Sequence, residues 1–153
     1  MPQSLSQIIV HLVFSVKDRQ PLLIREIRPA LHAYLSVVLR DHECPAFRVG
    51  GVADHVHLAF ALSRKTSVSD LVETLKVSSS KWIKQQFPRF PELTRFSWQR
   101  GYGAFSIGES DKDKLIKYID EQEEHHRAKT FQDEYRIFLK KYQIQYDERY
   151  VWD

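Results

Sequence analysis

The sequence predicts an α+β fold: a ferredoxin-like β-α-β-β-α-β core with an antiparallel sheet, followed by C-terminal helices. Two kinds of apolar pattern alternate along the chain in this order, one typical of strands and one of helices. Strand-like segments are residues 8–16, 46–62 and 96–107, and helical ones are residues 27–42 and 67–87. The length of 153 residues fits a single domain over 1–153. We expect the core at about 6–108 and a helical part with a tail at about 110–153.

The first strand and the first helix have clear periodicities. Every even position of the strand is apolar, which predicts one buried face; these positions are Ile8, Val10, Leu12, Phe14 and Val16. Apolar residues then recur at helical spacing from Ile27 to Val38. Pro29 falls in the first turn, where its missing N–H is tolerated. We therefore expect a helix that ends near His42.

Residues 46–62 are predicted to form a hairpin that turns around Gly50 to Asp54. In its second strand, apolar residues occupy one face, whereas His55 and His57 lie on the other face with two alanines. The histidines should therefore point away from the apolar layer. Both helices of a ferredoxin-like core pack on one face of the sheet, so we expect the other face to be free for a site or a partner.

The second helix should open at Ser67, which resembles a capping box with Asp70, and end at Phe87-Pro88. The fourth strand is expected within the aromatic segment 96–107, where glycines introduce bends.

Two further helices are predicted after the core. Ser110 and Asp113 resemble a second capping pair, at the start of a third helix over residues 113–129. Its apolar side carries Leu115, Ile116 and Ile119. Thr130 and Asp133 should begin a last helix that runs through Tyr142, and the aromatic tail should pack as an arm.

Composition narrows the class of protein. The net charge of +3 permits a nucleic-acid partner without demanding one. A single cysteine, Cys44, excludes an intrachain disulfide and favours a cytoplasmic location. No apolar run approaches the roughly 18 residues that span a bilayer, so we expect no membrane association.

The histidine pair is the first candidate site. His55 and His57 lie about 6.6 Å apart on one side of a strand, a spacing that suits two ligands of one metal ion. Seven histidines in 153 residues give roughly 0.3 such pairs by chance, so two surface histidines are the alternative. Their position on the open face of a central strand favours a site.

Tyr118 and Gln122 form the second candidate site. They are four residues apart on the predicted third helix, so one lies above the other, with His125 a turn further along. Tyrosines at a helix margin usually pack structurally. Together with the histidine pair, however, they would supply a hydroxyl nucleophile and an amide oxygen for a metal.

Residues 76–100 form a basic segment with interleaved aromatics, including Trp82 and Trp98. Cations bind backbone phosphates and aromatic faces stack on unpaired bases, so this segment is the candidate DNA-binding region. A solvated helix face above core aromatics is the alternative. The candidate DNA-binding residues are Lys76, Lys81, Lys84, Arg89, Arg95 and Arg100.

Five segments resemble, in order, the small single-tyrosine HUH transposases of the IS200-like family. These segments are HLVFSVKDR, RVGGVADHVHLAF, SSSKWIK, WQRGYGAFSI and YIDEQEEHH, and the resemblance extends over nearly the whole chain. The resemblance implies a homodimer of ferredoxin-like domains that nicks and rejoins single-stranded DNA at hairpin-marked element ends. It also implies Mg²⁺ or Mn²⁺ as cofactor, and no nucleotide cofactor.

Four residues match the motifs of that family. The resemblance implies that His55, His57 and Gln122 bind the metal and that Tyr118, on a C-terminal helix, is the nucleophile. It further implies sites shared in trans between two subunits. No role transfers to Asp54, His125 or His11, which we expect to pack structurally although His11 lies where it could face the pair.

General chemistry supports a tyrosine nucleophile beside a metal ion, independently of the family resemblance. A phenol of pKa about 10 is roughly one part in a thousand ionised at pH 7, so a divalent cation that polarises the phosphate would assist its attack. The product, a 5′-phosphotyrosine, keeps the phosphodiester energy, so another strand's hydroxyl rejoins DNA without ATP.

Three alternative functions compete with this interpretation. An RRM-like single-strand binder has the same element order, but the face with His55 and His57 lacks the aromatics such a protein uses. A histidine phosphoesterase with two H-x-[ST] motifs is excluded, because the sequence has none. A domesticated transposase relative with a host role would keep the same residues.

Overall fold

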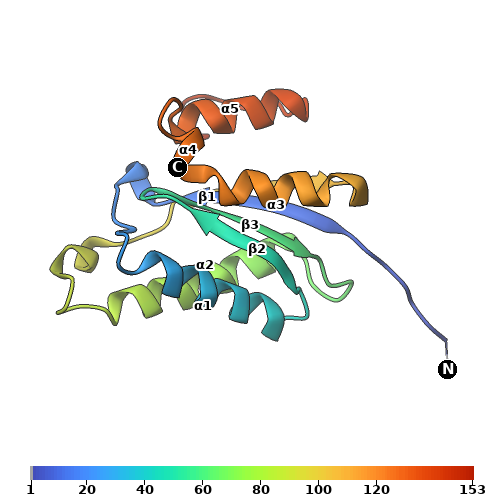
Figure 1. Cartoon of the computed structure of the whole chain (residues 1–153), viewed down its shortest axis with the longest axis horizontal. Coiled ribbons are helices and arrows are strands. Elements are labelled where there is room, and N and C mark those ends of the chain that lie inside the picture. Colours follow the sequence, from blue (N-terminus) through green and yellow to red (C-terminus); the bar gives the residue numbers. More distant parts are fainter. Residues whose placement is uncertain (1) are drawn as a thin grey trace.

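Four antiparallel strands form one sheet in the order β2-β3-β1-β4 (Figure 1). The computed structural model describes residues 2–153. The strands are β1 (Ile9–Ser15), β2 (Ala46–Gly51), β3 (His55–Ala61) and β4 (Gly103–Ile107). This order places β1 and β3 at the centre of the sheet and confirms the predicted ferredoxin-like core.

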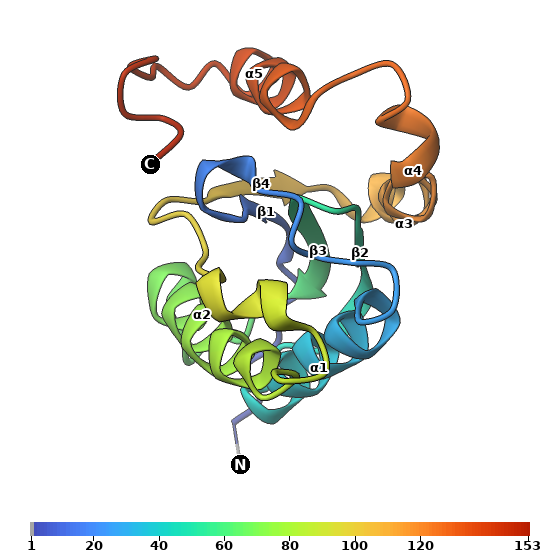
Figure 2. The ribbon, with the colours of Figure 1, turned by 90° about the vertical axis from the view of Figure 1, so that its left-hand side faces the viewer.

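Helices α1 (Arg28–Asp41) and α2 (Val68–Lys84) cover one face of the sheet (Figure 2). The main hydrophobic core lies between them and the even-numbered residues of β1 and β3. Helix α2 begins as predicted, because the Ser67 hydroxyl accepts a hydrogen bond from the backbone N–H of Asp70 at 3.1 Å.

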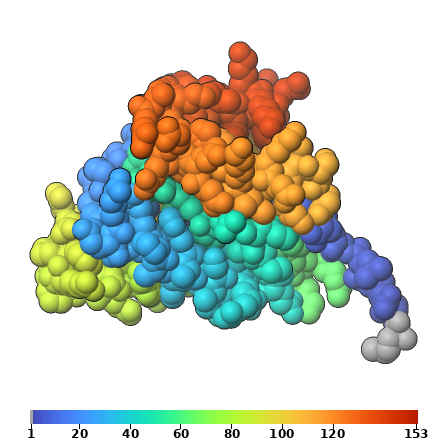
Figure 3. All heavy atoms as spheres, viewed as in Figure 1, coloured from blue at the N-terminus to red at the C-terminus, as the bar shows by residue number. Residues whose placement is uncertain are grey.

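The C-terminal helices α3 (Lys112–Asp120), α4 (Gln122–His125) and α5 (Phe131–Lys141) cover the other face (Figure 2). The expectation that this face is free is therefore wrong. Strand β1 is buried along both faces rather than one. Its odd residue Val13 packs against Phe131 and Leu139 of α5 in a second apolar cluster. In the space-filling view, α3 to α5 (orange to red) lie directly on the rest of the molecule (Figure 3).

The predicted helix over residues 113–129 is wrong as one element. Helical geometry breaks at Glu121, where φ is −98° and ψ is 19°, and the short α4 continues in another direction. Ser110 is not a cap: a 3₁₀ turn over Glu109–Asp111 precedes α3, whose N-cap, Asp111, makes no side-chain cap bond. Helix α5 begins as predicted, with the Thr130 hydroxyl accepting from the Asp133 N–H at 3.1 Å.

The fourth strand is shorter than predicted. It occupies only residues 103–107, and Trp98 makes an isolated bridge with Val16 of the segment after β1. The C-terminal tail packs as an arm: Trp152 lies against Tyr135, with ring centroids 5.9 Å apart, and the Asp153 carbonyl accepts from the Gly101 N–H at 2.8 Å. No helix among residues 2–153 has the length and apolarity needed to cross a bilayer.

Candidate active site

The two histidines of β3 face the C-terminal helices. Because side chains alternate along a strand, His55 and His57 share the face opposite Val56 and Leu58, as predicted. Both are nevertheless fully buried, since the C-terminal helices cover them. Their ring centroids lie 5.0 Å apart, so the two imidazoles form one cluster.

Asp54 fixes the orientation of His55. Its carboxylate can only accept, so His55 Nδ1–H donates to it, at 2.6 Å. The other ring nitrogen, Nε2, then faces inward, 3.1 Å from Gln122 Oε1 and 3.3 Å from Glu134 Oε1. A carboxylate behind a histidine is the usual arrangement when the opposite nitrogen binds a metal. Asp54 thus has a role that the sequence alone did not assign.

His11 of β1 supports His57 in the same way. His11 Nε2 lies 2.7 Å from His57 Nδ1, and both rings are buried. His57 Nε2 points into the cluster, 3.0 Å from Glu134 Oε1. The expectation that His11 only packs is therefore incomplete, because it also contacts the histidine pair directly.

Glu134, like His126, is a site residue that the sequence did not reveal. It lies on α5, is only 3% exposed, and presents Oε1 to the β3 histidines and Oε2 to Tyr118 and to Gln122 Nε2. No short motif links it to residues 77 positions earlier. A weaker signal existed, since Glu134 falls on the helix side that Phe131 and Tyr135 make apolar.

Charge and burial shift the pKa values of the cluster. Burial by itself lowers the pKa of His55, but hydrogen bonds with the carboxylates of Asp54 and Glu134 outweigh it and raise this pKa to about 9. Burial lowers the pKa of His57 to about 4. Burial opposes ionisation of Glu134, yet hydrogen bonds with the surrounding histidines hold its pKa well below the usual range. Without a metal, the cluster therefore pairs an imidazolium at His55 with the Glu134 carboxylate.

A third imidazole, His126, also turns its Nε2 inward. Its Nδ1–H donates to the Lys129 carbonyl at 2.7 Å, which leaves Nε2 as an acceptor when the ring is neutral. This Nε2 is buried without a hydrogen-bond partner among the described residues and lies 3.3 Å from Glu134 Oε2. Two acceptors at this distance repel each other unless a proton or a cation lies near them.

The converging acceptors fit a divalent metal ion. Ligand atoms of His55, His57, His126 and Glu134 all lie within 4.8 Å of one another. Gln122 turns its carbonyl oxygen toward His55 because its amide Nε2 donates to Glu134 Oε2 at 3.2 Å. Imidazole nitrogens favour transition metals, whereas Mg²⁺ prefers oxygen ligands and water.

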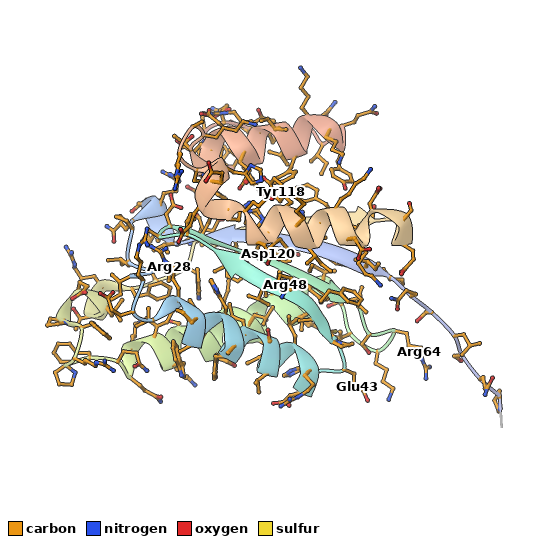
Figure 4. The ribbon with its side chains drawn as sticks, in the orientation of Figure 1. Arg28, Glu43, Arg48, Arg64, Tyr118 and Asp120 are labelled. Carbon is orange, nitrogen blue, oxygen red and sulfur yellow. The ribbon has the colours of Figure 1, made fainter. Side chains whose placement is uncertain are left out.

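Tyr118 lies on α3 directly beside the cluster, between α3 and α5 (Figure 4). Its ring centroid is 5.7 Å from that of His57, and its hydroxyl donates to Glu134 Oε2. His125 stacks on the same ring at 4.6 Å. Burial and then the charge of Glu134 raise the pKa of Tyr118 well above its ordinary value. The four residues singled out from the sequence, including Gln122 beyond the helix break, therefore meet in one place.

Two contacts position α3 against β2 and so position Tyr118. Arg48 pairs with Asp120 at 3.0 Å across the gap between the two elements (Figure 4). Gly50 lets the helix approach closely, since a Cβ there would lie 2.7 Å from Ile119 Cγ2. The absence of a side chain at Gly50 thus allows Ile119, the residue after Tyr118, to pack directly against β2.

The basic segment lies mainly on and after α2, and α2 packs on the other face of the sheet from the histidines (Figure 2). Lys76 is engaged within the chain, because its ammonium donates to the carbonyls of Gln99, Arg100 and Gly101 at 2.7–3.1 Å. Burial lowers the pKa of Lys76 to about 8. The other five basic candidates are exposed: Lys81, Lys84, Arg89, Arg95 and Arg100.

The aromatics of this segment divide between core and surface. Phe96 and Trp98 are buried, and Trp82 stacks on Tyr34 with ring centroids 5.5 Å apart. Phe87 is 47% exposed. The interpretation as core aromatics is therefore correct for Phe96 and Trp98, and Phe87 remains open to contact.

A cavity of about 600 Å³ opens beside the cluster. His126 belongs both to its lining and to the cluster, and Asp54, which orients His55, also lines it. Its lining also includes four basic residues: Arg25, Arg28, Arg127 and Lys129. Arg28 lies at the start of α1 (Figure 4). Three acids, Asp54, Glu123 and Asp133, also line it, and Glu123 pairs with Arg25 and Arg28. The lining is therefore mixed in charge, with a slight basic excess.

Comparison with known proteins gives a consistent family. The family described as "Transposase IS200 like" matches residues 4–122. The chain is 30% identical over 114 residues to the transposase for insertion sequence element IS200 of Salmonella typhimurium, covering 73% of this chain and 74% of that protein. It is 25% identical over 118 residues to the ISDra2 transposase TnpA of Deinococcus radiodurans, covering 76% of this chain and 84% of that protein.

Two solved structures share the fold. A putative transposase from Deinococcus radiodurans matches with a TM-score of 0.63 at 21% identity, over 80% of this chain and 95% of that one. A REP-associated tyrosine transposase bound to a REP hairpin matches with a TM-score of 0.54 at 16% identity, over 82% of this chain and 72% of that one. At these identities the likeness concerns the fold alone.

Proposed function

Since the chain belongs to the IS200-like transposase family, we propose that it nicks and rejoins single-stranded DNA at hairpin-marked ends through a 5′-phosphotyrosine on Tyr118. One observation carries the proposal: the Tyr118 hydroxyl lies beside a cluster of metal-type ligands that includes His55, His57 and Gln122. A nucleophile next to such a cluster is what phosphodiester cleavage requires.

His55, His57 and Gln122 would hold the metal through Nε2, Nε2 and Oε1. The bound ion would polarise the scissile phosphate and orient it for in-line attack. Of the two ions that the resemblance implies, Mn²⁺ suits this nitrogen-rich set better than Mg²⁺, which prefers oxygen ligands. No nucleotide cofactor is required, because the covalent link conserves the energy of the broken bond.

Tyr118 supplies the nucleophile. Its Oη forms a bond to phosphorus while the bond from that phosphorus to the 3′ oxygen breaks, which leaves a 5′-phosphotyrosine and a 3′-oxygen that takes up a proton from water. The phenolic proton points at Glu134 Oε2, so a proton acceptor is in contact with the nucleophile. Attack by another strand's 3′-hydroxyl reverses these bond changes and transfers the strand.

The DNA would contact two basic regions. We assign the single strand that carries the scissile phosphate to the cavity beside His126, because this cavity adjoins the cluster and its lining has four basic residues against three acids. The exposed residues Lys81, Lys84, Arg89, Arg95 and Arg100 are the candidates for duplex or hairpin phosphates. A hairpin partner is supported by the REP-associated transposase, whose structure was solved with a hairpin bound.

An RRM-like binder is disfavoured by the closed sheet face. Such proteins stack bases on an open sheet, whereas α3 and α5 cover this one and bury His55 and His57. A domesticated relative with a host role would use the same chemistry, so the reaction itself is what must be tested.

The test is a covalent adduct with labelled single-stranded DNA from the flanks of the protein's own gene. With Mn²⁺ present we expect a labelled protein band on a denaturing gel, and no band after chelation or with His57→Ala. Tyr118→Phe should also abolish the band while hairpin binding persists. A protein that binds these strands but forms no adduct with any divalent ion would contradict the proposed chemistry.

A homodimer with sites shared in trans is the second part of the proposal, and it rests on the family. In a single chain Tyr118 lies beside its own His57, so shared sites require α3 to change places between subunits. Mixing inactive His57→Ala with inactive Tyr118→Phe separates the two arrangements. Restored cleavage after subunit exchange supports shared sites, whereas no recovery in demonstrated heterodimers would assign each site to one chain.

A further inference from the structure

The C-terminal helix α5 reaches the candidate metal site from outside the region that matches the family. That match ends at residue 122, whereas α5 spans Phe131–Lys141. We propose that Glu134 of α5 is a further ligand of the metal held by His55, His57 and Gln122, so that metal binding and docking of α5 stabilise each other. This inference rests on the proposed metal site.

The positions of the Glu134 oxygens carry the argument. Oε1 lies 3.0 Å from His57 Nε2 and 3.3 Å from His55 Nε2, so it faces the same space as both nitrogens. Oε2 points the other way, where it accepts from Tyr118 and from Gln122 Nε2. One oxygen is thus directed at the metal position, while the other orients the nucleophile and the amide ligand.

The burial of Glu134 is consistent with a cation beside it. A carboxylate with 3% exposure is costly unless cationic partners compensate its charge. No Lys or Arg among the described residues forms an ion pair with Glu134; its recorded ionic partners are the histidines alone. Without a metal, the His55 imidazolium compensates this charge. When the histidines bind a metal as neutral ligands, the divalent cation among them does so instead.

The surroundings of α5 hold Glu134 in this place. Phe131, Tyr135 and Leu139 of α5 pack on Val13 and Phe105 of the sheet. The fit is close, because a Cβ at Gly103 of β4 would lie 2.6 Å from Tyr135 Cε2. Apolar docking therefore presents the carboxylate inward, and a metal that binds it adds free energy to the same docked state.

The experiment is a calorimetric titration of the full chain with Mn²⁺ alone, without DNA. We expect Glu134→Gln to weaken Mn²⁺ binding at least tenfold, in the range of about 10–100-fold seen when groups around a metal site are removed. Asp133→Asn is the matched control: it removes the same charge one residue earlier, at an exposed position. It should bind Mn²⁺ as the wild type does.

Hydrogen exchange of the α5 amides provides a readout besides affinity. Mn²⁺ should slow exchange over residues 131–141 in the wild type and in Asp133→Asn, but not in Glu134→Gln. Glu134→Asp keeps the charge but withdraws it by one methylene. The slowing of exchange by Mn²⁺ in this variant should lie between that of the wild type and that of Glu134→Gln. Circular dichroism of each variant without metal shows whether it folds, so a folding defect is not mistaken for a lost ligand.

The outcomes separate this inference from the proposed function. If His57→Ala loses Mn²⁺ binding and Glu134→Gln does not, the metal site stands and Glu134 is not a ligand. Tighter Mn²⁺ binding by Glu134→Gln would likewise overturn the inference, because the carboxylate would then compete with the ion for the histidines. If neither substitution changes Mn²⁺ binding, the metal site itself is wrong.

Discussion

Replacing Gly50 with alanine should displace the nucleophile without altering any group of the cluster. The new Cβ would lie 2.7 Å from Ile119 Cγ2 and 3.2 Å from the Ile119 carbonyl oxygen. Ordinary contact begins at 3.4 Å, so the shortfall is about 0.7 Å. Ile119 is buried and its branched side chain has little rotamer freedom, so α3 itself must move away from β2.

The expected cost follows from this overlap. Overpacking of a closely packed contact destabilises by about 1–3 kcal/mol. Tyr118 precedes Ile119 and must move with it. Since misplacement of a reacting group by 1 Å costs roughly a hundredfold in rate, we expect adduct formation to slow by roughly ten- to a hundredfold.

Gly108→Ala is the matched control. A Cβ at Gly108 meets only Ser110 Oγ, at 4.0 Å, and the backbone angle φ of −71° suits alanine. Both substitutions restrict the unfolded chain equally, so their difference in urea unfolding isolates the clash at Gly50. Equal unfolding free energies and equal adduct rates in the two variants would show that contact with β2 does not position Tyr118.

Three further predictions concern residues outside the cluster. Lys76→Met should lower the free energy of unfolding in urea by about 1–3 kcal/mol, since three carbonyls lose a charged donor; a weaker salt dependence of DNA binding instead would make Lys76 a phosphate contact. Replacing Lys81 and Lys84 together with alanine should reduce the slope of log affinity against log salt by roughly 0.9 per lost duplex phosphate contact, and an unchanged slope would make them a solvated helix face. Burial lowers the pKa of His32 to about 4. Between about pH 6.5 and 4, His32 therefore binds a proton in the unfolded chain but not in the folded one, and the free energy of unfolding decreases as the pH is lowered. Urea titrations should show that His32→Gln loses about 1–3 kcal/mol less than the wild type over this window, and equal losses would exclude His32 as a cause.

The sequence predicts the ferredoxin-like core because its elements have local patterns. Alternation along β3 assigns His55 and His57 to the face away from α1 and α2, and the Ser67 cap marks the start of α2. The sequence does not predict that both faces of β1 are buried. Its odd positions mix His11 with Val13, so they resemble a polar face until a distant helix covers them.

The remaining errors concern contacts that no local pattern encodes. The break at Glu121 separates α3 from α4 although glutamate itself favours a helix. Glu134 enters the cluster only because α5 docks through Phe131 and Tyr135. Such docking depends on tertiary packing across the chain, so an isolated acidic residue on an amphipathic helix gives little warning of its role.

The most direct test of the account is to map the linkage in the covalent adduct. After reaction with single-stranded DNA and Mn²⁺, protease and nuclease digestion followed by tandem mass spectrometry should place a 5′-linked nucleotide on the peptide that contains Tyr118. None of the other six of the seven tyrosines should carry it. A nucleotide linked to another residue, or linked through its 3′ end, would contradict the proposed role of Tyr118.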